Sequence, residues 1–313
     1  MRWILILSCM LLSSCEQYTK KTVRIAINPW PGYEFLYLAD QKGIFEDVGL
    51  DIELVELASL ADVQRIYVQG RVDGMASTMI EVVHVVGESQ EPLTIVLLPD
   101  YSNGGDVIVT RSDIKNLADL RGKVVMAELG SLGMFMLHLG LEKAQLSLND
   151  VQLNNSEQLE VQSLFSSQAI DAAVTYPPFS TQVLRDSNYH IIFDSSEIPK
   201  QVIDVVSVKS EIVNQDPTWV PRFHQAWGKA LAFARENPQE AYSIMAEREG
   251  ISVDEFEDAL SGLRLVDEGQ QASALADKYL QLNAQAVCQV LVSNQPMNFE
   301  CSDIKNKVQV PDL

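Results

Sequence analysis

The stretch Ile25-Ala-Ile-Asn-Pro-Trp-Pro-Gly-Tyr-Glu-Phe-Leu-Tyr-Leu-Ala-Asp-Gln-Lys-Gly-Ile-Phe45 changes its structural period twice. Residues 24–27 have the pattern of a buried strand, and apolar residues from Phe35 onward recur at helical spacing until Gly43, a typical helix stop. Between them, two prolines remove backbone donors and a glycine permits unusual dihedral angles. Residues 28–33 are therefore predicted to form an irregular strand-to-helix turn.

Trp30 and Tyr33 lie in this turn. Ligands of open α/β sheets bind at the carboxyl ends of strands, so both aromatic rings are expected where a small molecule would bind. The surrounding prolines and glycine favour exposure of the rings in a cleft. The alternative is that both side chains belong to the core.

The rest of the chain alternates strand and helix patterns in two similar units. In the first unit, strands are predicted at 51–57, 72–77 and 92–98, and Ser59 is predicted to cap a helix between the first two of them. In the C-terminal part, Ser252 and Glu255 form a predicted capping box. Turn residues at 100–106 mark a hinge after the first unit, and an apolar strand at 202–209 returns across it into a helical C-terminal part. The pattern predicts an α/β, two-lobed clamp, in which each lobe is a mixed, mostly parallel sheet flanked by helices. Lobe 1 is expected to comprise residues 22–103 and 207–313, and lobe 2 residues 104–206.

The N-terminus is typical of a secretory signal, because a basic start precedes an apolar run over residues 3–12 that is too short to span a bilayer. Leu12-Ser-Ser-Cys15 resembles the bacterial lipobox. This predicts a signal peptide at 1–14, acylation of Cys15 and a tether at 15–21, with the protein lipid-anchored on the periplasmic side of the envelope. The alternative is an ordinary secreted protein in which Cys15 is incidental.

Two cysteines, Cys288 and Cys301, then remain unmodified in an oxidising compartment. Their spacing favours a disulfide that fixes the C-terminal tail. A metal site is the alternative, but the chain has no Cys-x-x-Cys pair and no clustered histidines. We expect no metal site.

Composition favours a soluble protein of two domains, with 313 residues of which 47% are hydrophobic. The formal net charge of −20 argues against binding nucleic acid or an anionic membrane through a basic face. The sequence has no nucleophile elbow, zinc-protease helix or phosphate loop. We therefore expect a binding protein with no catalytic residues and no cofactor.

Four segments together carry a family resemblance: Trp30-Pro-Gly-Tyr-Glu34, Asp100-Tyr-Ser-Asn-Gly-Gly-Asp106, Glu128-Leu-Gly-Ser-Leu-Gly133 and Asp171-Ala-Ala-Val-Thr-Tyr176. With these motifs the chain, over roughly residues 23–265, resembles substrate-binding proteins of bacterial ABC importers, in the nitrate, sulfonate and thiamine-pyrimidine group. The resemblance implies a type II periplasmic-binding-protein fold. It also implies a monomer that closes on a small-molecule ligand and delivers it to a membrane permease driven by an ATPase.

The predicted ligand-binding residues share a position at the end of a strand or the start of a helix. They are Trp30, Tyr33, Glu34, Thr78, Asp106, Ser131, Leu132, Tyr176 and Asp204. The backbone N–H groups of residues 131–133 open a helix and are expected to hold an anionic group or a polar oxygen of the ligand. Tyr176 is expected to close the cleft from the second lobe; packing of the Pro-Pro turn is the alternative role.

Acidic residues occur in these turns, and Arg and Lys do not. Glu34, Asp106, Glu128 and Asp204 are candidate walls of the cleft, each with the alternative role of a solvated turn residue or hinge cap. A buried anion without charged partners is costly. We therefore expect a neutral, cationic or zwitterionic organic solute containing nitrogen, of the sulfonate/taurine-like or pyrimidine-like kind.

Two other functions use the same fold. Fungal pyrimidine synthases resemble this group, but they carry a cysteine-rich motif that the chain lacks. A ligand-sensing partner of a membrane receptor kinase or cyclase would use the same clamp and dock on a receptor instead of a permease.

Overall fold

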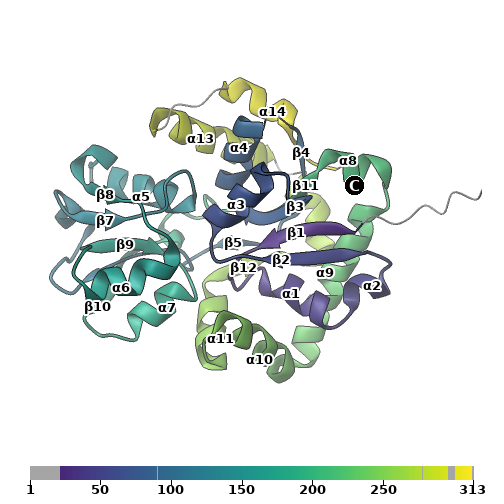
Figure 1. Cartoon of the computed structure of the whole chain (residues 1–313), viewed down its shortest axis with the longest axis horizontal. Coiled ribbons are helices and arrows are strands. Elements are labelled where there is room, and N and C mark those ends of the chain that lie inside the picture. The colour runs from purple at the N-terminus through teal and green to yellow at the C-terminus, as the bar shows by residue number, and fades with distance from the viewer. Residues whose placement is uncertain (1–21, 90, 277, 295–299, 312–313) are drawn as a thin grey trace, which may run out of the picture.

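The computed structural model describes residues 22–89, 91–276, 278–294 and 300–311. The predicted signal peptide, Cys15 and the tether lie outside the described residues. The fold is built around two mixed sheets that lie in separate lobes (Figure 1). This confirms the predicted two-lobed α/β architecture.

The first lobe contains a six-stranded sheet in the order β13-β4-β11-β3-β1-β2. Its strands are β1 (Val23–Ile27), β2 (Ile52–Glu56), β3 (Gly74–Thr78), β4 (Leu93–Leu97), β11 (Asp204–Lys209) and β13 (Val308–Gln309). Strand β11 is antiparallel to both of its neighbours, and the other pairings are parallel. Strands β3 and β4 are buried along their whole length, which explains their continuous apolar or small residues.

The second lobe contains a five-stranded sheet in the order β10-β6-β9-β7-β8. Its strands are β6 (Val107–Arg111), β7 (Val124–Met126), β8 (Gln152–Asn154), β9 (Ala172–Thr175) and β10 (Tyr189–Asp194), and its helices are α5 (Leu132–Lys143), α6 (Val161–Ser166) and α7 (Phe179–Leu184). Here β6 is antiparallel to both neighbours. Figure 1 shows this lobe in teal on the left.

The helices of the first lobe follow the turn signals of the sequence. They are α1 (Glu34–Gln41), α2 (Ile44–Asp47), α3 (Leu60–Val68), α4 (Met79–Ser89), α8 (Ser210–Gln215), α9 (Trp219–Glu236), α10 (Pro238–Glu249), α11 (Val253–Ser261), α12 (Gln271–Leu275), α13 (Lys278–Asn294) and α14 (Ile304–Lys307). Gly43 has a φ of +66° directly after the end of α1, as its role as a stop requires. Ser252 and Glu255 form a capping box at the start of α11.

Helix α4 has no counterpart among the predicted elements. Its residues 79–87 are all buried, so no polar face marks the helical period. The helix follows β3 directly and places Glu81 in its first turn. This unpredicted helix therefore brings a buried acid to the end of a central strand.

The hinge segment expected at 100–106 passes between the two sheets. It begins with β5 (Asp100–Ser102), which pairs antiparallel with β12 (Leu263–Leu265) in a separate two-stranded sheet. In Figure 1 these two strands lie between the lobes. Ile203 forms an isolated antiparallel bridge with Tyr101. The segment that re-enters the first lobe therefore runs beside the segment that leaves it.

A disulfide links two segments of the C-terminal part. The predicted disulfide between Cys288 of α13 and Cys301 is present, with the two Cα atoms 5.7 Å apart.

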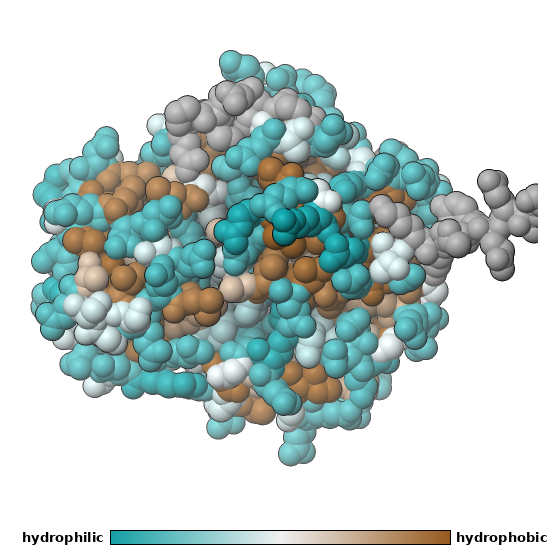
Figure 2. Space-filling view, in the orientation of Figure 1, coloured by the Kyte–Doolittle hydropathy of each residue, from teal (hydrophilic) through white to brown (hydrophobic). Residues whose placement is uncertain are grey.

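The space-filling view in Figure 2 shows hydrophilic residues over much of one face with hydrophobic residues scattered among them, as expected for a chain of net charge −20.

Candidate solute-binding site

A small enclosed cavity lies where the two lobes meet. Its lining comes from strand ends and helix starts of both lobes: Asn28, Trp30, Tyr33, Leu60, Thr78, Asp106, Leu132, Tyr176 and Asp204. Its internal volume of about 10 Å³ is enough for about one water molecule. The strand-to-helix turn after β1 thus faces residues that precede β6 and follow β9.

The aromatic side chains of the cavity are buried and do not stand open in a cleft. Trp30 is 4% exposed, Tyr33 1% and Tyr176 4%, so the expected exposure of Trp30 and Tyr33 was wrong. The Trp30 and Tyr176 rings meet edge to face, with their centroids 6.0 Å apart. Because these rings come from different lobes, their contact closes the cavity.

Buried carboxylates satisfy the polar ends of two of these rings. The indole Nε1–H of Trp30 donates to Asp100 Oδ2 over 3.3 Å, and the hydroxyl of Tyr33 donates to Asp204 Oδ1 over 2.5 Å. Buried Trp and Tyr side chains need such acceptors. The acids therefore fix the orientation of the rings.

Two glycines make room for this arrangement. A Cβ atom on Gly32 would stand 1.9 Å from Asp100 Oδ2, and one on Gly105 would stand 2.7 Å from Trp30 Cη2. Only glycine lets the backbone approach these groups so closely. The Pro-Gly and Gly-Gly turns of the sequence are thus explained by packing around Trp30 and Asp100.

Three aspartates gather beside the cavity. Burial raises the pKa of Asp106 to about 7 and that of Asp100 to about 8. Burial, followed by the charges of Asp100 and Asp106, raises the pKa of Asp204 well above its usual value. These carboxyl groups share a buried site, where like charges disfavour ionisation of all of them.

The N-terminus of α5 holds a carboxylate of the protein itself. Glu81 Oε1 accepts hydrogen bonds from Ser131 Oγ over 2.7 Å and from the Leu132 backbone N–H over 2.9 Å. Its other oxygen, Oε2, accepts from the backbone N–H and hydroxyl of Thr78 over 3.0 and 2.5 Å. The ligand contact expected at Ser131 and at the Leu132 N–H is therefore taken by Glu81, and this carboxylate joins the two lobes.

Two other predicted acids lie outside the lining of the cavity. Glu34 opens α1, is fully buried, and pairs with Arg248 of α10, which also contacts Glu56. Burial raises its pKa, and the guanidinium of Arg248 opposes that rise. Glu128 Oε1 accepts from the Gln158 backbone N–H over 3.2 Å. The expected wall positions of Glu34 and Glu128 were wrong, because each carboxylate is held by its own lobe.

Four residues of the site were not predicted: Asn28, Leu60, Glu81 and Asp100. Asn28 follows directly on the predicted strand 24–27 and Asp100 stands two residues after the predicted strand 92–98, which is the same signal that identified Trp30 and Thr78. Glu81 is an isolated acid in an apolar run, a pattern typical of a buried, partnered charge. Leu60 carries no signal beyond its place after the Ser59 N-cap.

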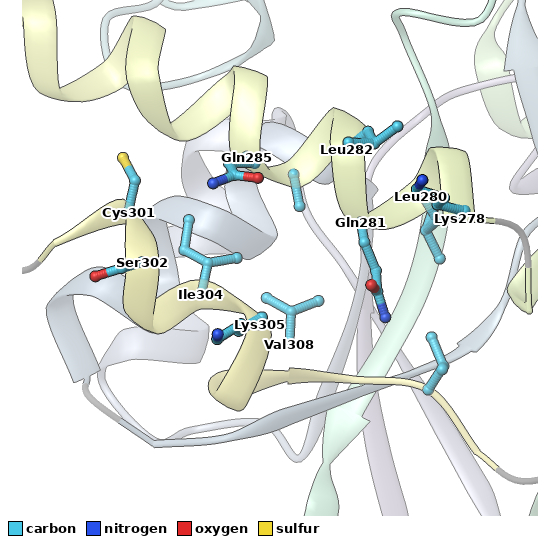
Figure 3. Close-up of a pocket in the computed structure, with 12 residues that line it drawn as sticks. Lys278, Leu280, Gln281, Leu282, Gln285, Cys301, Ser302, Ile304, Lys305 and Val308 are labelled. Atoms are coloured by element: carbon cyan, nitrogen blue, oxygen red, sulfur yellow. The ribbon is translucent and has the colours of Figure 1, made fainter.

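A second pocket lies under α13 beside the C-terminal segment, remote from these residues. Figure 3 shows Leu280, Ile304 and Val308 around it, together with Lys278 and Lys305. None of its lining residues also lines the cavity between the lobes.

No described helix is long and apolar enough to cross a membrane. The described residues also contain no group of three or more histidine, cysteine or acidic side chains arranged to hold a metal ion.

Comparison with curated proteins gives relatives over about half of the chain. A putative binding protein of Brucella abortus (strain 2308) is 30% identical over 152 residues, which are 45% of this chain and 46% of the relative. A putative thiamine biosynthesis protein of Haemophilus influenzae is 26% identical over 166 residues, 52% of either chain. The chain thus spans about half the length of these curated relatives.

Solved structures with the same fold cover nearly the whole chain. The periplasmic aliphatic sulphonate binding protein SsuA from Escherichia coli has a TM-score of 0.79 at 16% identity, over 93% of this chain and 92% of that one. The periplasmic nitrate-binding protein NrtA from Synechocystis has a TM-score of 0.72 at 15% identity, over 92% and 86%. The family model described as NMT1/THI5 like matches residues 30–241. With more than half of its length matched, the chain belongs to the NMT1/THI5-like family.

Proposed function

We propose that this protein is the solute-binding component of an ABC importer and captures a small, nitrogen-containing organic molecule between its lobes. The observation that carries the proposal is the cavity itself, which strand ends of both lobes line with aromatic and polar side chains. Ligands of two-lobed α/β proteins bind in this position, where closure of the lobes encloses them. The lobes are proposed to divide near residues 104 and 206.

The relatives support this function. SsuA and NrtA are described as periplasmic sulphonate-binding and nitrate-binding proteins, and the Brucella relative as a putative binding protein. We propose a periplasmic location for this chain, with the lipid on Cys15 as its membrane anchor. Delivery to a permease, action as a monomer and the absence of enzymatic activity belong to the same proposal.

A thermal-shift screen with nitrate, alkanesulfonates, aliphatic amines and aminopyrimidines tests this function. A solute that binds only the folded protein raises its melting temperature, by an amount that grows with concentration. Isothermal titration then measures its affinity for the wild type and for Tyr176→Ala, which removes one wall of the cavity. We expect at least a tenfold loss of affinity in the variant.

The matched control is Tyr189→Ala, which removes a tyrosine from β10 whose ring packs on Phe165 and does not line the cavity. It should leave the affinity unchanged. Failure of every solute class to bind would contradict the proposed function. Equal affinity in the wild type and Tyr176→Ala would show that the solute binds elsewhere.

A further inference from the structure

The cavity has buried hydrogen-bond acceptors without donors. Asn28 Oδ1 and Asp106 Oδ2 have no hydrogen-bond partner among the described residues, and both side chains are 1% exposed. The amide nitrogen of Asn28 is already used, since it donates to the Pro29 carbonyl over 3.0 Å. A buried acceptor without a partner is costly, so the missing donors are expected to come from the solute.

The cavity also lacks positive charge. Asp106 and Asp204 line it, Asp100 lies behind the Trp30 ring, and none of its lining residues is Lys, Arg or His. Burial and the charges of Asp100 and Asp106 raise the pKa of Asp204, which favours protons on these acids when no cation is bound. A cation would replace those protons.

The donors at the start of α5 and at the end of β3 that could hold an anion are already occupied. The N–H of Leu132 and the hydroxyls of Ser131 and Thr78 all donate to Glu81. In contrast, the Trp30 and Tyr176 rings line the cavity, and the faces of such rings attract organic cations. The lining is thus complementary to a group that donates hydrogen bonds and carries positive charge.

We propose that the solute presents a positively charged nitrogen with N–H donors, an ammonium or amidinium group, to Asp106 and Asn28. This inference rests on the proposed function, because it names the class of solute that the cavity takes. The cavity of about 10 Å³ has room for about one water molecule. The lobes must therefore stand further apart to admit the charged group of the solute.

Three planar molecules of nearly equal size test the charge: acetamidinium, acetamide and acetate, with methanesulfonate as a second anion. Titrations followed by the NMR signals of the tryptophan indole N–H groups report binding beside Trp30. We expect acetamidinium to bind at least tenfold more tightly than acetamide, and the two anions more weakly than either. Asp106→Asn should weaken acetamidinium binding at least tenfold and change acetamide binding less than threefold.

Glu142→Gln is the matched control, because this acid of α5 is 60% exposed and lies on the same lobe. It should leave every affinity unchanged.

Should Asp106→Asn fail to fold, the pH dependence of binding to the wild-type protein supplies the test. The groups around Asp106 are Asp100, Asp204, Glu81 and Tyr176. Deprotonation of the aspartates should strengthen acetamidinium binding between pH 6 and 8, while acetamide binding stays constant.

Tighter binding of acetate or methanesulfonate than of acetamidinium would overturn the inference. So would acetamidinium binding that is indifferent both to pH and to Asp106→Asn. In either case a small molecule still binds to the protein, so the proposed solute-binding function would stand. Lack of binding by these probes and by every class in the thermal-shift screen would contradict the proposed function as well.

Discussion

Arg248 holds two acids at once, and one of them is fully buried. Its guanidinium contacts Glu34 and Glu56, and its side chain is only 5% exposed. Removing one partner of a buried ion pair leaves an uncompensated charge. We expect Arg248→Ala to lower the free energy of unfolding by about 3–5 kcal/mol, measured by urea denaturation.

Arg235→Ala is the comparison for that measurement. Arg235 pairs with Asp267 on the surface, where the two side chains are 63% and 57% exposed. Exposed pairs contribute about 0–1 kcal/mol, so this variant should unfold close to the wild-type midpoint. If both variants lower the free energy of unfolding by a similar amount, breaking the buried Arg248–Glu34 pair is no more costly than breaking a surface pair.

At the same scale, sequence patterns located several residues of the site but not their partners. Trp30, Tyr33 and Thr78 were found because strand-to-helix turns have a recognisable composition. The pairing of Tyr33 with Asp204 joins positions 171 residues apart, and no local pattern encodes such a contact. For the same reason Glu34 was wrongly assigned to the cleft, since its partner Arg248 lies 214 residues away.

Among the secondary-structure elements, α13 depends on a covalent link to the segment before α14. The disulfide closes a loop of 13 residues, for which the chain-entropy model gives about 3 kcal/mol of stability. We expect reduction with dithiothreitol to lower the free energy of unfolding by about that amount. Chemical denaturation with and without the reductant measures it.

The double variant Cys288→Ala with Cys301→Ala provides the control, since it should unfold like the reduced wild type and ignore the reductant. If the oxidised and the reduced protein have the same free energy of unfolding, the disulfide does not contribute to stability. A double variant that still responds to dithiothreitol would show that another thiol is involved.

Elements with caps or alternating apolar residues were predicted well, and elements without them were not. Ser59 and Ser252 mark helix starts in the sequence and in the structure. Helix α4 was missed because burial on all sides removes the amphipathic period. Strand β5 was taken for a hinge turn because three residues pairing with a distant partner leave no local pattern.

On the scale of the whole molecule, the buried acids make stability depend on pH. Burial raises the pKa of Asp106 to about 7 and that of both Asp100 and Glu128 to about 8, whereas unfolded acids titrate near 4. Between these values the folded protein binds more protons than the unfolded chain, so its stability falls as pH rises. The slope is about 1.4 kcal/mol per pH unit for each such carboxyl.

Urea denaturation of the ligand-free protein at pH 6.5, 7.25 and 8 should therefore show a decreasing free energy of unfolding. His224, whose pKa burial lowers, opposes this trend near the lower end of the window, where the unfolded chain still binds a proton at this residue. Asp106→Asn should reduce the slope, because one of the titrating acids is then absent. Stability that increases from pH 6.5 to 8 would show that the acids are ionised in the folded protein.

The carboxylate of Glu81 at the start of α5 acts as an intramolecular competitor. It is tethered to the same molecule, so it reaches those N–H groups without the entropy loss that a free anion pays on binding. An anionic solute at this end of the helix would have to displace it. We therefore expect the protein to discriminate against anions by occupying the place in advance, and a substitution of Glu81 to open that place to them.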